Sequence, residues 1–169
     1  MSDPRGLIVL GIDPGLAATG YGLVRAQGDD YQALDFGAIS SSSRLTRAQR
    51  LGRIYEGLSA VIRTWSPDEV AVEDFIVGHV RAAVAVGEAR AVALLAATQA
   101  GLPVSLYKPL EVKQFVTSYG RGSKEQVQEM VRALLGLHEL PQPADAADAL
   151  AVALCHCLRR PTNIVEVQP

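Results

Sequence analysis

The chain has 169 residues, of which 49% are hydrophobic and 20% are charged, so it is long enough for one domain with a sizeable core, and wholesale disorder is excluded. Its net charge of −2 argues against a protein that coats nucleic acid through bulk electrostatics, although phosphate contacts need only a local basic patch. No stretch reaches the roughly 18 apolar residues of a membrane span, and the N-terminus lacks a secretory pattern. We therefore expect a cytoplasmic protein with no membrane segment.

The first part of the chain predicts three strands in succession. Residues 7–13 form a nearly continuous apolar run, which is typical of a strand buried on both faces. Residues 19–25 and 31–40 predict two further strands, joined by the turn Gly28-Asp29-Asp30. Short connections between successive strands indicate an antiparallel meander.

Helices and short strands alternate through the rest of the chain. Apolar residues recur at three- and four-residue spacing from Leu45 to Trp65, which predicts an amphipathic helix. Ser123 and Gln126 predict a capping box at the start of a later helix. The remaining elements are expected to be a strand at 69–75, an Ala- and Val-rich helix at 80–100, a strand at 104–107 and helices at 109–119, 124–135 and 143–158.

This order predicts an α/β fold in which a five-stranded mixed sheet has helices on both faces. Such an order suits an RNase H-like domain. We expect residues 1–161 to form this one domain and residues 162–169 to form a flexible tail.

Four acidic residues are predicted to converge although they lie far apart in the sequence. Asp13 ends the first buried strand, and Glu73 stands near the end of the fourth. Asp145 and Asp148 are three residues apart on the last helix, so they share one face near its N-terminus. The four carboxylates meet if the first and fourth strands are neighbours and the last helix packs across their ends.

Such a cluster has the chemistry of a phosphodiester hydrolase. Carboxylate oxygens suit Mg²⁺ or Mn²⁺. Two such ions about 3.5–4 Å apart can activate a water molecule and stabilise the leaving oxygen. Without cations between them, the carboxylates would repel one another.

Each acid also has a simpler interpretation. Asp13 before Pro14-Gly15 can belong to a turn, and Glu73 can be a solvated charge at the end of a strand. Asp145 can stabilise the helix dipole by about 0.3–1 kcal/mol. The dipole explains Asp148 poorly, because like charges on one helical face are destabilising. Taken singly, each simpler interpretation is favoured, and the combination of all four favours catalysis.

The two cysteines, Cys155 and Cys157, lie on different faces of the last predicted helix, so we expect neither a disulfide nor a shared metal site. Cys155 follows the apolar spacing of the helix and is interpreted as a core residue. His156 is interpreted as a surface or packing residue rather than a ligand.

The chain resembles the bacterial RuvC family from about Leu7 to Arg160. LGIDPG alone is not specific, because actin-like ATPases begin with a similar strand and turn, but its combination with KEQVQEMV and ADAADALA is specific. The matching stretches are LGIDPG (10–15), TGYG (19–22), VE (72–73), GEARAV (87–92), VKQ (112–114), KEQVQEMV (124–131) and ADAADALA (144–151).

The resemblance implies an RNase H-like nuclease that resolves Holliday junctions, the four-way DNA junctions of recombination. It implies a homodimer that cuts two strands of like polarity symmetrically and works with the RuvA–RuvB branch-migration complex. It also implies two Mg²⁺ or Mn²⁺ ions per active site, and it carries the catalytic and metal-binding roles over to Asp13, Glu73, Asp145 and Asp148.

Contacts with DNA are implied for several further residues. Lys113 and Lys124 match basic positions that the family uses on DNA. The family carries an aromatic residue three positions after the catalytic glutamate, followed by a Lys-Asn pair, and the aromatic stacks on a base near the crossover. Here Phe75 comes two positions after Glu73, and the following loop is one residue short and lacks the Lys-Asn pair. Phe75 is thus either the stacking residue or a core residue, and His79 either replaces the missing polar contact or is solvated.

The segment Gly120 to Lys124 (GRGSK) joins two predicted helices. Its glycines let the backbone approach a phosphate, and a helix N-terminus offers free N–H groups. Arg121 adds a positive charge. The alternative is a tight turn between helices, and the resemblance favours phosphate contact.

The Ala- and Val-rich helix at 80–100 is our hypothesis for the dimer interface, and burial within one subunit is the alternative. Three other functions fit parts of the sequence. An RNase H-type nuclease acting on an RNA–DNA hybrid would use the same acids. An actin-like ATPase needs two such domains, for which 169 residues leave no room. A catalytically inactive DNA-binding module is disfavoured by the presence of all four acids.

Overall fold

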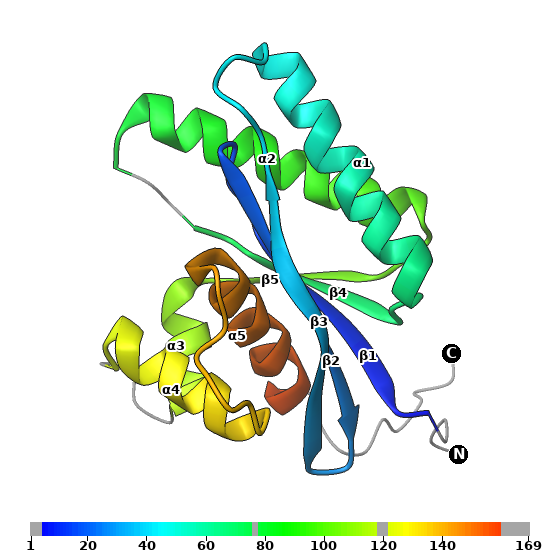
Figure 1. The fold of residues 1–169 in the computed structure, drawn as a ribbon, viewed down its shortest axis with the longest axis vertical. Helices are drawn as coiled ribbons and strands as arrows, with labels where there is room; N and C mark the ends of the chain where they lie inside the picture. The colour runs from blue at the N-terminus through cyan, green and yellow to red at the C-terminus, as the bar shows by residue number, and fades with distance from the viewer. Residues whose placement is uncertain (1–4, 76–77, 118–121, 160–169) are drawn as a thin grey trace, which may run out of the picture.

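The computed structural model describes residues 5–75, 78–117 and 122–159, so Arg121 and the expected tail at 162–169 lie outside the described residues (Figure 1). The order of the elements is the one predicted from the sequence. The described chain forms β1 (Leu7–Asp13), β2 (Ala18–Gln27), β3 (Asp30–Ser40), α1 (Arg47–Trp65), β4 (Glu69–Glu73), α2 (Val80–Gln99), β5 (Val104–Tyr107), α3 (Pro109–Thr117), α4 (Lys124–Leu134) and α5 (Ala144–Arg159).

The five strands form one mixed sheet in the order β3-β2-β1-β4-β5. β1, β2 and β3 form the predicted antiparallel meander, whereas β1 pairs with β4, and β4 with β5, in parallel. Ile12 is in register with Val72, so Asp13 and Glu73 each follow directly at the same end of two neighbouring strands. The first and fourth strands are therefore neighbours, which is the condition on which the meeting of the four carboxylates depends.

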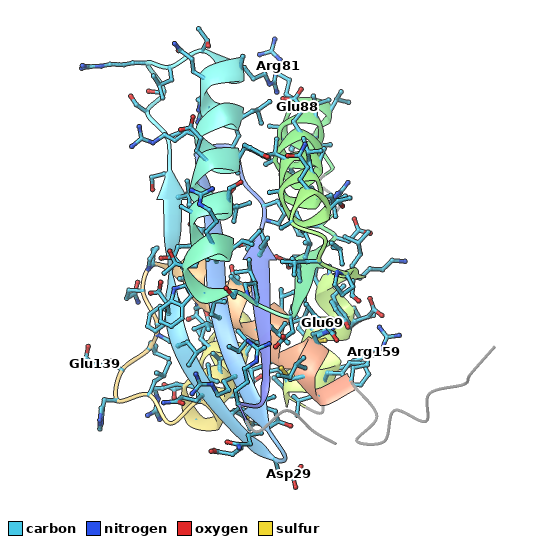
Figure 2. All side chains as sticks on the ribbon, turned by 90° about the vertical axis from the view of Figure 1, so that its right-hand side faces the viewer. Asp29, Glu69, Arg81, Glu88, Glu139 and Arg159 are labelled. Atoms are coloured by element: carbon cyan, nitrogen blue, oxygen red, sulfur yellow. The ribbon has the colours of Figure 1, made fainter. Side chains whose placement is uncertain are left out.

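Helices cover both faces of this sheet. α1 and α2 run side by side on one face, and α3, α4 and α5 cover the other (Figures 1 and 2). Along β1, Leu10 and Ile12 pack in the cluster with α1 and α2, whereas Val9 packs in the cluster with α5. Burial on both faces explains the apolar run of this strand. No helix within the described ranges is long and apolar enough to cross a membrane.

Side-chain caps set the starts of two helices. Thr46 and Gln49 form a capping box at the N-terminus of α1, and Ser123 and Gln126 form the predicted one at α4. α1 ends at Trp65, and the next residue, Ser66, caps the helix in a left-handed conformation. Lys124, the first residue of α4, is thereby fixed at the end of the helix that faces α5.

Glycines bring α5 into direct contact with β1 and β2. A Cβ atom built on Gly11 would lie 2.0 Å from the carbonyl oxygen of Ala149, and one built on Gly20 would lie 2.0 Å from the carbonyl oxygen of Asp145. A Cβ atom built on Gly22 would lie 2.7 Å from the side chain of Leu150 on α5 and 2.9 Å from its backbone nitrogen. Any larger residue at these positions would push the helix off the sheet, so the glycines of the LGIDPG and TGYG stretches set the distance at which α5 carries its acids over β1.

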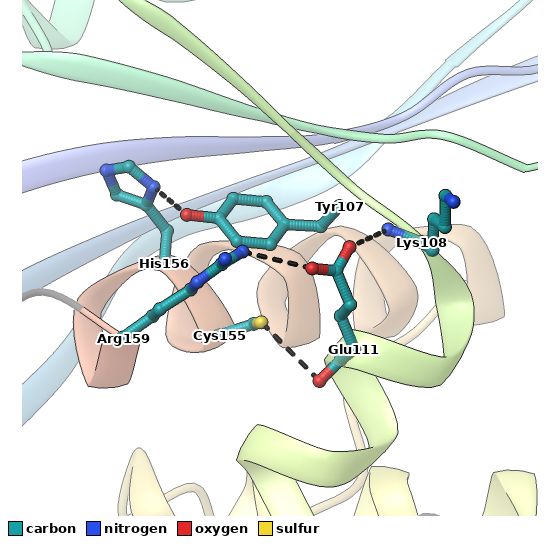
Figure 3. Close-up of polar contacts among 6 residues, drawn as sticks. All are labelled: Tyr107, Lys108, Glu111, Cys155, His156 and Arg159. Carbon is teal, nitrogen blue, oxygen red and sulfur yellow. Dashed lines mark hydrogen bonds and ion pairs between the residues drawn. The ribbon is translucent and has the colours of Figure 1, made fainter.

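A buried polar network joins the far end of α5 to β4 and β5. Figure 3 shows the part of it between His156 on α5 and Tyr107 on β5. The Tyr107 hydroxyl lies 2.6 Å from Nδ1 of His156, and Nε2 of the same ring lies 2.5 Å from a carboxylate oxygen of Glu69. Arg159 pairs with Glu111 at 3.0 Å and lies over the Tyr107 ring. The interpretation of His156 as a packing residue is therefore confirmed.

The cysteines behave as expected. Both are buried and neither forms a disulfide, and Cys155 is a core residue on the face of α5 that meets α3. One boundary differs from the prediction. β4 ends at Glu73 rather than at Phe75, because the last pairing with β5 joins Glu73 to Tyr107. Phe75 consequently lies beyond the sheet.

Candidate active site

Asp13 and Glu73 meet at the carboxyl ends of β1 and β4. The Asp13 carboxyl group donates a hydrogen bond to Glu73, which accepts it as a carboxylate. Burial raises the pKa of Asp13 to about 9, helped by the hydrogen bond to Glu73 and by the charges of Glu73, Asp148 and Asp145. Burial also raises the pKa of Glu73. A pair of carboxyl groups in this position holds a proton because burial disfavours the charged form and because the two negative charges would lie close together.

Helix α5 brings Asp148 to the same place. Its carboxylate lies 3.2 Å from Nζ of Lys124. Burial raises the pKa of Asp148 although Lys124 acts in the opposite direction. The charge of Asp148 in turn raises the pKa of Lys124. Asp145, one turn earlier on α5, is close enough to act on Asp13 and Asp148 through its charge.

A cavity of about 350 Å³ opens at this point. Three of the four predicted acids line it, and Asp145 does not. Two lysines and one phenylalanine also line the cavity. A phosphate group that enters it would therefore meet both the carboxylates and the positively charged lysine side chains. The lining residues are Asp13, Glu73, Phe75, Pro109, Val112, Lys113, Lys124, Val127, Asp148 and Ala151.

A larger hollow of about 630 Å³ lies beside α4. Glu129 is the only acid among the described residues that line it. This hollow lacks the group of carboxylates that metal-assisted hydrolysis needs, so the smaller cavity is the better candidate.

The residues predicted to contact DNA lie in different surroundings. Lys113 and Lys124 both line the acidic cavity. Phe75 is 45% exposed at its rim, so the interpretation of Phe75 as a core residue is wrong. His79 is an exposed residue at the N-terminus of α2, and its side chain makes no capping hydrogen bond.

The donor set of the cavity fits a hard divalent cation. Its acids supply only carboxylate oxygens, which Mg²⁺ and Mn²⁺ prefer. Within the described ranges, no three His, Cys, Asp or Glu side chains already stand in a metal-ligating arrangement. Positive charge is instead provided by the proton that Asp13 shares with Glu73 and by the ammonium group of Lys124. A cation would take the place of these two charges.

Sequence reasoning did not single out two residues beside this site. Arg90 on α2 forms an ion pair with Asp74, the residue that follows Glu73, with 2.7 Å between Nη1 and Oδ1. The only signal available was the position of Arg90 within the GEARAV stretch. Nothing in the periodicity of an Ala- and Val-rich helix indicates that Arg90 contacts the residue that follows β4.

A mixed sheet in this strand order, with carboxylates gathered where its two central parallel strands end, defines the RNase H-like class of nuclease folds. Residues 9–156 match the family model of crossover junction endodeoxyribonuclease RuvC, and the chain belongs to this family.

Individual relatives agree with this assignment. The chain is 52% identical to the crossover junction endodeoxyribonuclease RuvC of Heliobacterium modesticaldum over 150 residues, which cover 88% of this chain and 93% of the relative. Its structure resembles that of Thermus thermophilus RuvC in complex with a Holliday junction substrate, with a TM-score of 0.86 and 38% identity over 90% of this chain and 93% of the other. The yeast mitochondrial Holliday junction resolvase, with a TM-score of 0.63 and 11% identity over 92% of this chain and 80% of the other, shares the fold.

Proposed function

We propose that this protein is a Holliday-junction resolvase that makes symmetric nicks in two strands of like polarity. The observation that carries the proposal is the meeting of Asp13, Glu73 and Asp148 in one cavity flanked by lysines. Family membership and the likeness to a RuvC protein solved with its junction substrate support the choice of DNA.

In this proposal Asp13, Glu73, Asp145 and Asp148 hold two divalent cations, Mg²⁺ or Mn²⁺, in each site. Such ions lower the pKa of a bound water and neutralise charge on the phosphate. The chain itself contributes buried carboxylates whose repulsion favours cation capture. On cation binding Asp13 would release its proton to solvent, and Asp148 would exchange its contact with Lys124 for the cation. Lys124 is then free to contact a phosphate oxygen.

Other residues would orient the DNA. Lys113 and Lys124 are proposed to contact the phosphate backbone at the cavity, and Arg121 and His79 are also proposed to contact DNA. The exposed ring of Phe75 is proposed to stack on an unpaired base near the crossover. An aromatic side chain at the cavity rim can hold a base aside while the adjacent phosphate reaches the acids.

A homodimer would match the symmetry of the substrate, because a two-fold dimer presents two identical sites. α2 packs its buried alanines, such as Ala89 and Ala93, against the same subunit. Its first half nevertheless exposes Val80 at 79% and Val84 at 46%. We propose that this exposed side of α2 forms the dimer interface. We also propose that the protein acts in the cytoplasm with the RuvA–RuvB branch-migration complex, as the family implies.

The test is cleavage of a synthetic, branch-migratable four-way junction in the presence of Mg²⁺ or Mn²⁺. We expect paired nicks at opposite positions, and little cleavage of linear duplex or of an RNA–DNA hybrid. Asp13→Asn and Asp148→Asn should abolish cleavage while largely retaining junction binding.

Asp29→Asn is the matched control, because Asp29 is exposed at the other end of the molecule, in the turn between β2 and β3 (Figure 2). It should cleave like the wild-type protein. Cleavage of hybrid or duplex as fast as of the junction, or full activity of the two active-site variants, would contradict the proposal.

A further inference from the structure

The short segment that follows Glu73 is held from two sides. The backbone N–H of Asp74 donates a hydrogen bond to the carbonyl oxygen of Tyr107 at 2.8 Å, which ties the segment to β5. On the other side, Nη1 of Arg90 on α2 lies 2.7 Å from Oδ1 of Asp74 and 3.3 Å from the carbonyl oxygen of Phe75. One guanidinium group thus binds two successive residues directly beyond the sheet.

This ion pair is less exposed to solvent than an ordinary surface ion pair. The side chains of Arg90 and Asp74 are 27% and 30% exposed, respectively. The guanidinium group is planar and cannot lose its proton, so it can hold a carboxylate and a carbonyl oxygen in fixed directions. Fixing the carbonyl group of Phe75 also fixes the peptide plane next to its Cα atom, and therefore restricts where its side chain points.

These contacts affect the position of the Phe75 ring. The ring stands at the rim of the acidic cavity, two residues after Glu73, and it lies outside both hydrophobic core clusters. Because core packing does not hold the ring, the backbone that carries it limits the directions in which the ring can point. Among the described contacts, those of Asp74 with Tyr107 and of Arg90 with Asp74 and Phe75 restrain that backbone.

We propose that Arg90 is a positioning residue for junction cleavage. Through Asp74 and the Phe75 carbonyl group it holds the Phe75 ring beside the carboxylates, so that the ring stacks on an unpaired base while the neighbouring phosphate enters the cavity. This inference rests on the proposed function. It assigns no contact between Arg90 and DNA.

The experiment uses the full chain and a four-way junction that carries 2-aminopurine beside the crossover, whose fluorescence rises when the base unstacks. Arg90→Ala, Phe75→Ala and the double variant are compared with the wild-type protein. Binding and fluorescence are measured with Ca²⁺, and single-turnover cleavage is measured with Mg²⁺. Arg63→Ala is the matched control, because Arg63 is an exposed arginine in the last turn of α1, near the opposite ends of the parallel strands.

We expect Arg90→Ala to bind the junction about as tightly as the wild-type protein, but to lose most of the fluorescence rise and about tenfold in cleavage rate, because small misplacements at an active site are costly. Phe75→Ala should show the same pattern. The double variant should be no worse than the poorer single variant, since both changes remove one function. Arg90→Lys should recover part of the rate, because it keeps the charge but not the planar group.

Three outcomes would overturn the inference. These are an Arg90→Ala protein that matches Arg63→Ala in fluorescence and rate, losses that multiply in the double variant, and a rate loss with an undiminished fluorescence rise. If Arg90→Ala does not fold, Asp74→Asn weakens the same ion pair from the other side and must reproduce the loss. A wild-type protein that does not cut the junction would overturn the proposed function as well, whereas normal cutting with no effect at Arg90 would overturn this inference alone.

Discussion

Nζ of Lys124, the first residue of α4, lies 3.2 Å from Oδ2 of Asp148 on α5. The ammonium group therefore supplies part of the positive charge that the buried carboxylates need. A bound cation and Lys124 compete for the same carboxylate, although both are useful during catalysis. This competition predicts opposite effects on metal binding and on cleavage.

Lys124→Met should bind Mn²⁺ more tightly, by about threefold, because removal of a partly exposed ion pair frees Asp148 at a cost of less than about 1 kcal/mol. The same variant should cut junctions much more slowly, because a phosphate contact is lost. Isothermal titration calorimetry and single-turnover cleavage measure the two effects. Lys108→Met, at an exposed lysine outside the acidic cavity, is the control. Unchanged or weaker Mn²⁺ binding by Lys124→Met would show that the two cations do not compete.

Asp13→Asn should stabilise the metal-free protein. The folded-state pKa of Asp13 is about 9, above the value of 3.8 for an unperturbed side chain. The folded protein therefore binds this proton more tightly than the unfolded chain does. The free energy of unfolding of the wild-type protein should fall as the pH rises from about 4 towards 9. The asparagine variant cannot titrate at this position and should not show this loss.

The difference in melting temperature between Asp13→Asn and the wild-type protein should consequently grow between pH 5 and pH 8 in the presence of EDTA. A gain of about 1 kcal/mol at pH 8 is expected, or about 2–4 °C for a chain of this size. Added Mg²⁺ should raise the melting temperature of the wild-type protein only. Asp29→Asn should melt like the wild-type protein at both pH values. If the difference in melting temperature did not change with pH, Asp13 would not hold a proton in the folded protein as inferred.

Gly20→Ala should displace the start of α5. The new Cβ atom would lie 2.0 Å from the carbonyl oxygen of Asp145, a backbone atom that cannot move without the helix. Overpacking of this kind costs about 1–3 kcal/mol. The shift should also carry Asp145 and Asp148 away from Asp13, so cleavage per folded molecule should fall by at least about tenfold.

Gly52→Ala on α1 is the matched substitution, because no atom lies within 4 Å of its added Cβ. Since alanine is the better helix former, this control should be as stable as the wild-type protein or more stable by up to about 1 kcal/mol. Denaturant unfolding and single-turnover cleavage distinguish the two variants. Equal activity of Gly20→Ala and Gly52→Ala would show that the close approach of α5 is not required.

Val84→Glu should convert the proposed dimer into monomers. Val84 is an exposed apolar residue on the first half of α2, and a carboxylate in an apolar interface would be desolvated without a partner. Analytical ultracentrifugation should show the monomer, and nicks on the two opposing strands should become uncoupled. Leu110→Glu changes an exposed apolar residue on α3 and should remain dimeric. A monomeric wild-type protein at micromolar concentration would contradict the interface.

The sequence by itself determined the order of the elements and the identity of the candidate acids. Apolar runs between turn residues indicate strands, and apolar residues at three- and four-residue spacing indicate helices, so these patterns predicted the meander, the following helices and the mixed sheet. The same patterns placed Asp13 at the end of a strand that is buried on both faces. They also placed Asp145 and Asp148, three residues apart, on one face of a helix.

Only the tertiary structure decided how these groups interact. The proton shared by Asp13 and Glu73, the exposure of Phe75 and the reach of Arg90 to Asp74 depend on distances between elements. Periodicity shows which side of an element faces inward, but not how closely two elements approach. Here α5 can approach the sheet closely because Gly11 and Gly20 have no side chain. Polar contacts between residues far apart in the chain set the other distances.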